Sequence, residues 1–316
     1  MPIGTGHGGA LCLLICGRDH CLGSGACGWL STANRFFLHK KRLFEEAIGL
    51  KIRVIVSGAG GKMGREVVRA VCGAEDMELA GAADPQHAGG DAGILAGLGE
   101  LGVPVASSVK EALTKADADC VVDFTTPAAA FGNVMEALEA GKRVVFGTTG
   151  LGESELSEID RVARAKDLGV IHAPNFAIGA VLMMRFAAEA ARFMEHVEII
   201  ELHHDQKKDA PSGTAIKTAE MIWEARGEKK LEIPGEMEVI SGSRGGEHRG
   251  IRIHSVRLPG LVAHQEVILG HVGQTLTIRH DSLDRSSFMP GVLLAIRKVR
   301  EVTGLVYGLE RLLFDA

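Results

Sequence analysis

A strand, a glycine-rich turn and a helix follow one another directly from residue 52, and this unit constrains the fold more than any other feature. Residues 52–56 (IRVIV) are an apolar run, residues 58–64 (GAGGKMG) are the turn, and Met63, Val67 and Val71 then recur on one helical face. In this context the glycines allow close backbone approach and the helix start offers unpaired N–H groups, which suits the pyrophosphate of a dinucleotide. Met63 stands where the standard spacing has its third glycine, so a tight turn without a ligand is the alternative interpretation.

The same rhythm of strand and helix continues to about residue 173. Further strands are predicted at residues 77–83, 103–105, 120–124, 143–146 and 170–173, and helices at residues 109–113, 128–140 and 155–166. Ser108 and the pair Thr126-Pro127 are typical of helix starts. Alternation of helices with buried-type strands predicts a Rossmann-type α/β domain, a doubly wound parallel sheet with helices on both faces.

After Asn175 the pattern changes to a second kind of domain. Helices are predicted at residues 178–194 and 213–226, and strands at residues 197–203, 237–243, 250–257, 263–269 and 274–280. Because helices no longer separate most of these strands, we expect an α+β domain with a mixed or antiparallel sheet. A last helix at residues 288–302 would return to the first domain. The predicted division is 51–175 with 286–316 for dinucleotide binding, and 176–285 for substrate binding and oligomerisation.

Residues 1–50 differ from the rest and are expected to be a poorly ordered extension. No charge precedes Arg18 and no helical or strand period is sustained, and the apolar run at residues 10–16 lacks the basic start of a signal peptide. No methionine lies between Met1 and Met63, which raises the hypothesis of a true start near Leu50. Four of the six cysteines, Cys12, Cys16, Cys21 and Cys27, fall here without paired C-x-x-C spacing. The other two, Cys72 and Cys120, are predicted to be buried free thiols.

The charge balance limits the partners of the chain. With 46% hydrophobic and 24% charged residues and a net charge of −5, the composition is that of a globular protein without a general attraction to nucleic acid. No stretch approaches the ~20 apolar residues of a membrane span. We therefore expect no nucleic-acid or membrane partner and a cytoplasmic location, and any anion site must be local.

Two residues give conflicting signals on the cofactor. Asp84 ends the second predicted strand, where an acid commonly holds the adenosine ribose hydroxyls and favours NAD. Lys62 in the glycine turn could instead contact a 2′-phosphate and favour NADP. A surface-turn aspartate before Pro85 is the alternative for Asp84. The runs FTTP (124–127) and GTTG (147–150) follow predicted strands at the edge where ligands gather, so we expect them beside the nicotinamide.

The run ELHHDQKKDAPSGT at residues 201–214 carries the predicted chemistry. Ser212 is a good helix cap, so Gly213 and Thr214 would present open N–H groups to a carboxylate. His203 and His204 end a strand and point to opposite faces, so at most one of them directly faces a reacting centre as a proton donor. For Lys207 and Lys208 a solvated pair is the alternative. Eight of the thirteen histidines lie between residues 196 and 280, but none has metalloprotease-type spacing, and no metal is predicted.

These motifs resemble the dihydrodipicolinate reductase family (4-hydroxy-tetrahydrodipicolinate reductases) from about Ile52 to the C-terminus. The resemblance is carried by residues 58–64, DFTTP at 123–127, GTTG at 147–150, APNF at 173–176 and the run at 201–214. It implies that His203 is the proton donor and Lys207 its companion, and that His204, Gly213 and Thr214 hold carboxylates. The residues that it implies for NADH and/or NADPH are Gly58, Ala59, Gly60, Gly61, Lys62, Met63, Asp84, Gly147, Thr148, Thr149, Ala173, Pro174, Asn175 and Phe176.

The resemblance further implies hydride transfer to the cyclic imine derived from 4-hydroxy-tetrahydrodipicolinate, in diaminopimelate and lysine biosynthesis. Homotetramers that assemble through the second domain, and domains that close on ligands, are implied as well. The extension and the lack of a basic residue directly after Asp84 depart from the family pattern, and the second leaves cofactor preference open. An aspartate dehydrogenase-like imine reductase and a non-catalytic nicotinamide sensor are the alternatives. The clustered His203 and Lys207 argue against both.

Overall fold

The computed structural model describes residues 51–230 and 235–314. Residues 51–316 form one of the two units into which the chain divides, and only this unit is described. Three predictions concern residues 1–50 and lie outside the described residues: that the segment is poorly ordered, that translation starts near Leu50, and that its four cysteines form no metal site.

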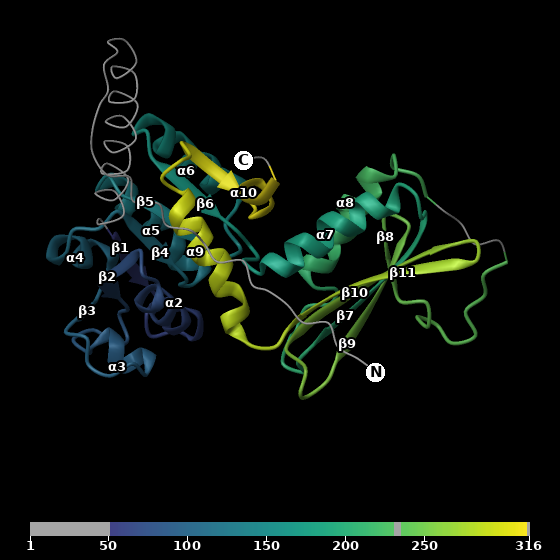
Figure 1. The fold of residues 1–316 in the computed structure, drawn as a ribbon, viewed down its shortest axis with the longest axis horizontal. Coiled ribbons are helices and arrows are strands. Elements are labelled where there is room, and N and C mark those ends of the chain that lie inside the picture. The colour runs from purple at the N-terminus through teal and green to yellow at the C-terminus, as the bar shows by residue number, and fades with distance from the viewer. Residues whose placement is uncertain (1–50, 231–234, 315–316) are drawn as a thin grey trace, which may run out of the picture. The chain divides into compact units, whose positions relative to one another are not determined.

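Seven parallel strands of the described chain form the first sheet, in the order β12-β6-β5-β4-β1-β2-β3 (Figure 1). The strands are β1 (Ile52–Ser57), β2 (Met77–Ala83), β3 (Val105–Ala106), β4 (Cys120–Asp123), β5 (Arg143–Phe146), β6 (Gly169–His172) and β12 (Gly304–Tyr307). The helices that go with them are α2 (Lys62–Gly73), α3 (Ala92–Ala96), α4 (Val109–Lys115), α5 (Pro127–Glu139), α6 (Glu153–Ala165), α9 (Met289–Lys298) and α10 (Glu310–Phe314).

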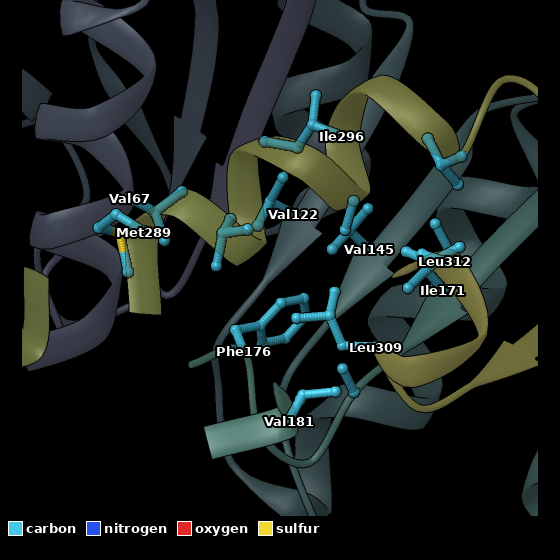
Figure 2. Close-up of a cluster of buried hydrophobic side chains, with 14 of the residues drawn as sticks. Val67, Val122, Val145, Ile171, Phe176, Val181, Met289, Ile296, Leu309 and Leu312 are labelled. Atoms are coloured by element: carbon cyan, nitrogen blue, oxygen red, sulfur yellow. The ribbon is translucent and has the colours of Figure 1, made fainter. Parts of the chain in front are cut away.

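Both faces of this sheet are buried, which explains the continuous apolar strands. Val122 of β4 packs in a cluster that includes Val67 of α2 and Ile296 of α9, and Figure 2 shows all three side chains in that cluster. The preceding residue, Val121, belongs to a second cluster with Leu138 of α5. Successive strand residues point to opposite faces, so helices cover both sides. The predicted doubly wound α/β architecture is confirmed.

The second sheet is mixed, as predicted. Its order is β11-β10-β7-β9-β8, with β7 and β9 parallel and the other neighbours antiparallel. The strands are β7 (His196–His203), β8 (Gly246–His248), β9 (Ile251–Arg257), β10 (Ala263–His271) and β11 (Gln274–Ser282). Helices α7 (Ile178–Ala191) and α8 (Gly213–Ala225) pack with this sheet, and their side chains share its buried cluster.

Several local predictions were wrong. Residues 237–243 form turns instead of a strand, because the Glu238 carboxylate accepts the N–H groups of Gly242 and Arg244 and bends the segment. Cys72 is exposed because it lies off the buried α2 stripe of Val67, Val68 and Val71.

The chain end also differs from the prediction. The last predicted helix is shorter: a 3₁₀ turn, η1 (Arg285–Phe288), precedes α9, and the unpredicted β12 follows it. Cys120 is buried as predicted, and Ser108 caps α4 through the N–H of Glu111. Of the helices in the described chain, none is long and apolar enough to cross a membrane.

Candidate active site

The glycine turn between β1 and α2 is held so tightly that side chains would not fit in it. Gly58 has φ +78°, and a Cβ on it would lie 2.7 Å from the carbonyl oxygen of Phe124. A Cβ on Gly64 would lie 1.9 Å from the carbonyl oxygen of Gly58. Helix α2 begins at Lys62 with Gly61 as its cap, so its first N–H groups have no partner within the helix. This turn fits a pyrophosphate, because its glycines allow close backbone approach and the helix dipole favours an anion there.

Asp84 is buried at the end of β2, so the surface-turn alternative is wrong. Its Oδ2 atom accepts the Gly60 N–H at 3.0 Å, and its Oδ1 atom accepts the Gln86 N–H at 3.0 Å. The His87 Nδ1 atom lies 3.0 Å from the same Oδ1 atom. Burial opposes ionisation, but the bonds from His87, Gly60 and Gln86 lower the pKa of Asp84 below its ordinary value. The carboxylate therefore anchors the glycine turn to the loop after β2.

A second buried carboxylate joins the two threonine loops. Asp123 is fully buried and accepts the Thr125 N–H at 3.1 Å and the Thr125 hydroxyl at 2.8 Å. Asn133 Nδ2 donates to it at 2.8 Å, and the Thr148 hydroxyl donates to it at 3.3 Å. A Cβ on Gly147 would lie 2.2 Å from the Phe124 ring. The runs FTTP and GTTG therefore meet at the carboxyl edge of the sheet, as the sequence predicted.

His172 supports the GTTG loop from below and was missed by the sequence analysis. Its ring stacks on Phe146 with centroids 4.1 Å apart and meets Tyr307 edge-on at 5.1 Å. Burial lowers the pKa of His172 to about 4, so the ring is neutral near neutral pH. Its Nε2 atom lies 3.1 Å from the Thr148 carbonyl oxygen, which requires the Nε2–H tautomer as donor.

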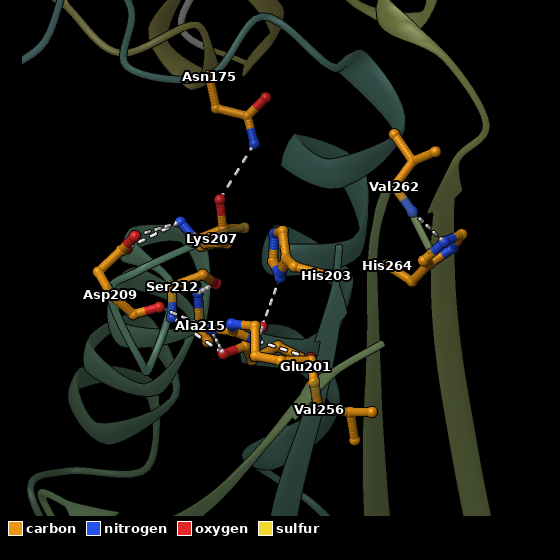
Figure 3. Close-up of polar contacts among 12 residues, drawn as sticks. Asn175, Glu201, His203, Lys207, Asp209, Ser212, Ala215, Val256, Val262 and His264 are labelled. Carbon is orange, nitrogen blue, oxygen red and sulfur yellow. Dashed lines mark hydrogen bonds and ion pairs between the residues drawn. The ribbon is translucent and has the colours of Figure 1, made fainter. Parts of the chain in front are cut away.

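A cavity of about 730 Å³ brings the predicted cofactor and substrate residues together. Thr149, Pro174 and Asn175 line one side of it, and the predicted chemical residues His203, Lys207, Ser212, Gly213 and Thr214 line the other. Asn175 Nδ2 donates to the Thr214 hydroxyl at 3.2 Å, a direct bond between the two sides that Figure 3 shows. Further lining residues that the sequence analysis did not select are Lys217, His264, Gln265, His280 and Tyr307.

Other predicted residues do not line this cavity. The side chains of Ala173 and Phe176 are buried in the hydrophobic cluster. His204 is exposed and absent from the cavity wall, whereas His203 lies on it. One of the two histidines thus faces the cavity, in line with the opposite faces expected of neighbours on a strand.

Glu201 orients His203 from beneath. Glu201 is fully buried on β7, and its Oε2 atom is bonded to His203 Nδ1 (Figure 3). Arg257 of β9 donates to both carboxylate oxygens, at 2.8 and 2.7 Å. Burial opposes ionisation, yet the bonds from His203 and Arg257 hold the pKa of Glu201 at about 2. Because the carboxylate accepts, His203 donates through Nδ1–H, which leaves Nε2 for proton exchange.

The same carboxylate positions the start of α8. Glu201 Oε1 accepts the Ser212 N–H at 3.2 Å, and the Ser212 hydroxyl caps the helix by accepting the Ala215 N–H at 3.2 Å. The predicted cap is therefore present. The N–H groups of Gly213 and Thr214 stand at the helix start, where the dipole favours an anion.

Lys207 contributes positive charge to the cavity from the loop between β7 and α8. Its Nζ atom lies 2.8 Å from both carboxylate oxygens of Asp209, and this bond lowers the pKa of Asp209. The Asp209 carbonyl oxygen accepts Arg257 Nη2 at 2.7 Å. Lys207 is thus positioned through the network around Glu201, whereas Lys208 is exposed.

Glu201 and Arg257 are two further functional candidates that sequence reasoning missed. Glu201 lies two residues before His203, and that spacing on a strand places both side chains on one face. This signal could have found it. Arg257 is different, because it meets Glu201 only through the parallel pairing of β7 with β9. Among residues 51–230 and 235–314, no cluster of His, Cys, Asp and Glu is suited to a metal ion.

A glycine cradle on a doubly wound sheet, next to a cavity with an oriented imidazole, defines the class of nicotinamide-dependent oxidoreductases. The comparisons with known proteins support that class and narrow it. Residues 52–176 match the family model "Dihydrodipicolinate reductase, N-terminus", and residues 179–313 match "Dihydrodipicolinate reductase, C-terminus". The chain belongs to the dihydrodipicolinate reductase family, and it is an NAD(P)H-dependent reductase.

Named relatives are similar over nearly their whole length. The 4-hydroxy-tetrahydrodipicolinate reductase of Desulfitobacterium hafniense (strain DSM 10664 / DCB-2) is 56% identical over 264 residues, which cover 83% of this chain and 99% of that protein. A reductase of the same name from Listeria monocytogenes is 53% identical over 262 residues, covering 83% and 100%. The predicted family is confirmed.

Solved structures agree on the fold. The dipicolinate-bound dihydrodipicolinate reductase from Paenisporosarcina sp. TG-14 is 46% identical, with a TM-score of 0.74, covering 83% of this chain and 99% of that one. The amine dehydrogenase from Mycobacterium smegmatis, at 16% identity and a TM-score of 0.57, covers 84% and 97% and shares the fold alone.

Proposed function

We propose that the protein reduces the cyclic imine formed from 4-hydroxy-tetrahydrodipicolinate to tetrahydrodipicolinate, in the diaminopimelate route to lysine. One observation carries this proposal. The imidazole of His203, oriented by a buried carboxylate, lines the same cavity as the nicotinamide-side loops and the start of α8. A proton donor and an anion receptor therefore meet where a reduced ring would lie.

The substrate is a small cyclic dicarboxylate, and two features of the cavity suit it. The start of α8 offers the N–H groups of Gly213 and Thr214 to one carboxylate, and Lys207 adds a cation on the same wall. We propose His204 as a ligand of the other carboxylate. Because His204 does not line the cavity, that role requires the predicted closure of the domains around the ligand.

The cofactor site comprises Gly58 to Met63, Asp84, Gly147 to Thr149 and Ala173 to Phe176. When bound, NADH and/or NADPH would supply a hydride to the conjugated cyclic imine. The chain itself binds the pyrophosphate through the glycine turn and positions the threonine loops through Asp123 and His172. Ala173 and Phe176, whose side chains are buried, would contribute backbone atoms to this site.

Residues on and next to the second sheet carry out the proton transfer. His203 delivers the proton from Nε2, and Glu201 stabilises the imidazolium that exists before transfer. Lys207 stabilises the negative charge that develops on the substrate, because a cation in a partly closed cavity acts through a low dielectric.

For assembly we propose a homotetramer in the cytoplasm, formed through the second sheet. Several apolar side chains on the loop after α8 and on the β10–β11 hairpin are open in the single chain: Met237, Val239, Ile240, Val272 and Leu276. Such a patch is typical of an interface. The division into a nucleotide domain (51–175 with 286–316) and a substrate domain (176–285) remains a prediction.

The first test is oxidation of NADH and NADPH, measured separately, with substrate made in situ from pyruvate and aspartate semialdehyde by the preceding synthase. We expect rapid oxidation that depends on the synthase. If neither cofactor is oxidised although both bind, the reductase proposal is wrong, and the sensor or a reductase with another substrate replaces it. An aspartate dehydrogenase-like activity would instead appear with oxaloacetate and ammonia.

A further inference from the structure

The lysines on the wall of the cavity beside His203 differ in how far the protein itself engages them. Lys207 Nζ lies 2.8 Å from both carboxylate oxygens of Asp209, so its charge is largely balanced within the chain. Lys217 of α8 lines the same cavity and is exposed. Within residues 51–230 and 235–314, no hydrogen bond or ion pair engages the ammonium group of Lys217. The wall therefore presents a cation that is open to a ligand.

The position of Lys217 on α8 directs its side chain toward the start of that helix. Lys217 follows Gly213 by four residues and Thr214 by three, and residues at these spacings share one helix face. Side chains on a helix lean toward its N-terminus, so the long chain of Lys217 covers the first turn. A Cβ on Gly213 would meet nothing within 4 Å, so the space over that turn is open. The ammonium group can therefore reach an anion that the N–H groups of Gly213 and Thr214 hold.

The carboxylates on the same wall lie against other groups. Glu220, three residues further along α8, has its Oε1 atom 3.6 Å from Nε2 of His248 in β8. The side chain of Glu310, at the start of α10, folds against Gly308, where an added Cβ would lie 2.4 Å from its Oε1 atom. Asp209 is bonded to Lys207, as described above. None of these carboxylates holds Lys217 away from the start of α8.

We infer that Lys217 is a substrate-binding residue, whose ammonium group completes the receptor for the carboxylate at the start of α8. This inference deepens the proposed function and rests on the substrate site described there. The N–H groups of Gly213 and Thr214 offer only partial charges, whereas a lysine adds a full charge and a charge-assisted hydrogen bond. Because His204 is absent from the cavity wall, Lys217 supplies this charge before any closure of the domains. It thereby favours a carboxylate over a neutral group at this position of the ring.

The test measures binding of pyridine-2,6-dicarboxylate, a flat and stable dicarboxylate, to the full-length protein by calorimetry in the presence of NADH. In Lys217→Ala and Lys217→Gln we expect its dissociation constant to rise roughly fivefold to tenfold, since a charge-assisted hydrogen bond is lost. The KM for the imine should rise by a similar factor while kcat stays within about twofold, because Lys217 moves no proton. Lys217→Arg keeps the charge and should bind the dicarboxylate within about threefold of the wild type. Alanine, glutamine and arginine are all favourable in a helix, so α8 should fold in each variant.

A control for net charge completes the experiment. Lys110→Ala removes an exposed lysine from α4, outside the cavity wall, and should leave the dissociation constant of the dicarboxylate unchanged. If Lys217→Ala and Lys217→Gln bind the dicarboxylate as tightly as the wild type, the inference is wrong. An equal loss of NADH affinity in these variants would also overturn it, since Lys217 would then act on the nucleotide. A wild-type protein that binds the dicarboxylate through Lys217 but reduces no substrate would contradict the proposed function and leave this inference standing.

Discussion

The two halves of the candidate site solve the problem of holding an anion in different ways. The glycine turn after β1 uses backbone N–H groups and a helix start, and its carboxylate anchor, Asp84, lies 24 residues from Gly60. The loop after β7 uses side-chain charges, and the partner that holds Glu201 is Arg257, 56 residues away. A backbone site is sensitive to the addition of a single carbon atom, whereas a charge network is sensitive to the loss of a single charge.

This contrast predicts different failures in the two regions. Changes in the second region should abolish the chemistry and leave the nucleotide bound. Changes in the first should weaken the nucleotide and leave the acid–base network intact. The following predictions test that separation, from the largest expected effect to the smallest.

The double variant His203→Ala/Lys207→Ala should lower kcat by roughly 10⁴-fold, because it removes both the proton donor and the cation that stabilises developing charge. Binding of NADH and NADPH, measured by calorimetry, should be unchanged. Lys208→Ala, a change at the exposed neighbour, is the control and should retain activity. Near-normal turnover in the double variant would remove both residues from the mechanism.

Glu201→Gln keeps the shape of the buried side chain but removes its charge. We expect kcat to fall roughly 10²-fold, because the residue that orients a catalytic histidine is lost. The KM for the imine should change much less than kcat, because Glu201 bonds His203 and does not line the cavity itself.

Stability should fall in the same variant by about 1–3 kcal/mol, since the partly buried Arg257 loses the charge of its partner. Glu158→Gln, which breaks an exposed ion pair with Arg161 on α6, should leave both the stability and kcat essentially unchanged. A kcat in Glu201→Gln equal to that of the wild type would mean that Glu201 has a purely structural role.

Gly64→Ala tests the glycine turn after β1, where backbone groups would hold the nucleotide. Its Cβ would lie 1.9 Å from the Gly58 carbonyl oxygen, so the turn must open. We expect both nucleotides to bind at least tenfold more weakly, a loss of about 1.4 kcal/mol or more. The control is Gly132→Ala within α5, where an added Cβ meets nothing within 4 Å. That change should stabilise the fold by about 0.5–1 kcal/mol without altering affinity.

His172 should make the free energy of unfolding sensitive to mild acid. Burial lowers its pKa to about 4 from the ordinary 6.5, so the unfolded chain takes up the proton first as the pH falls. This shift adds up to ~3 kcal/mol to the free energy of unfolding. The contribution is present in full above about pH 6.5 and is lost as the pH falls from 6.5 to 4. Urea unfolding at pH 7.5 and 5.0 should show a smaller difference for His172→Asn than for the wild type. An equal difference would show that other groups cause the acid sensitivity.

Most of the first domain could be predicted from sequence, because its signals are local. The strand β2 was predicted with its observed bounds, and α5 and α6 to within two residues, since apolar period and cap residues lie within each element. Errors arose where local signals mislead. The apolar residues of 237–243 resemble a strand, but the Glu238 carboxylate holds the chain in a turn. The strand β12 has too few residues to show a periodic pattern.

The sequence by itself determined which chemical groups the protein has: a glycine turn, two threonine loops, and a histidine and lysine before a capped helix. Only the tertiary structure decided which of them act together. It brought Arg257 beside Glu201, placed His203 instead of His204 on the cavity, and packed His87 against Gly60. The physical reason is that helix periods, caps and turns depend on neighbours along the chain, whereas burial and ion pairing depend on strand order and register between segments far apart in sequence.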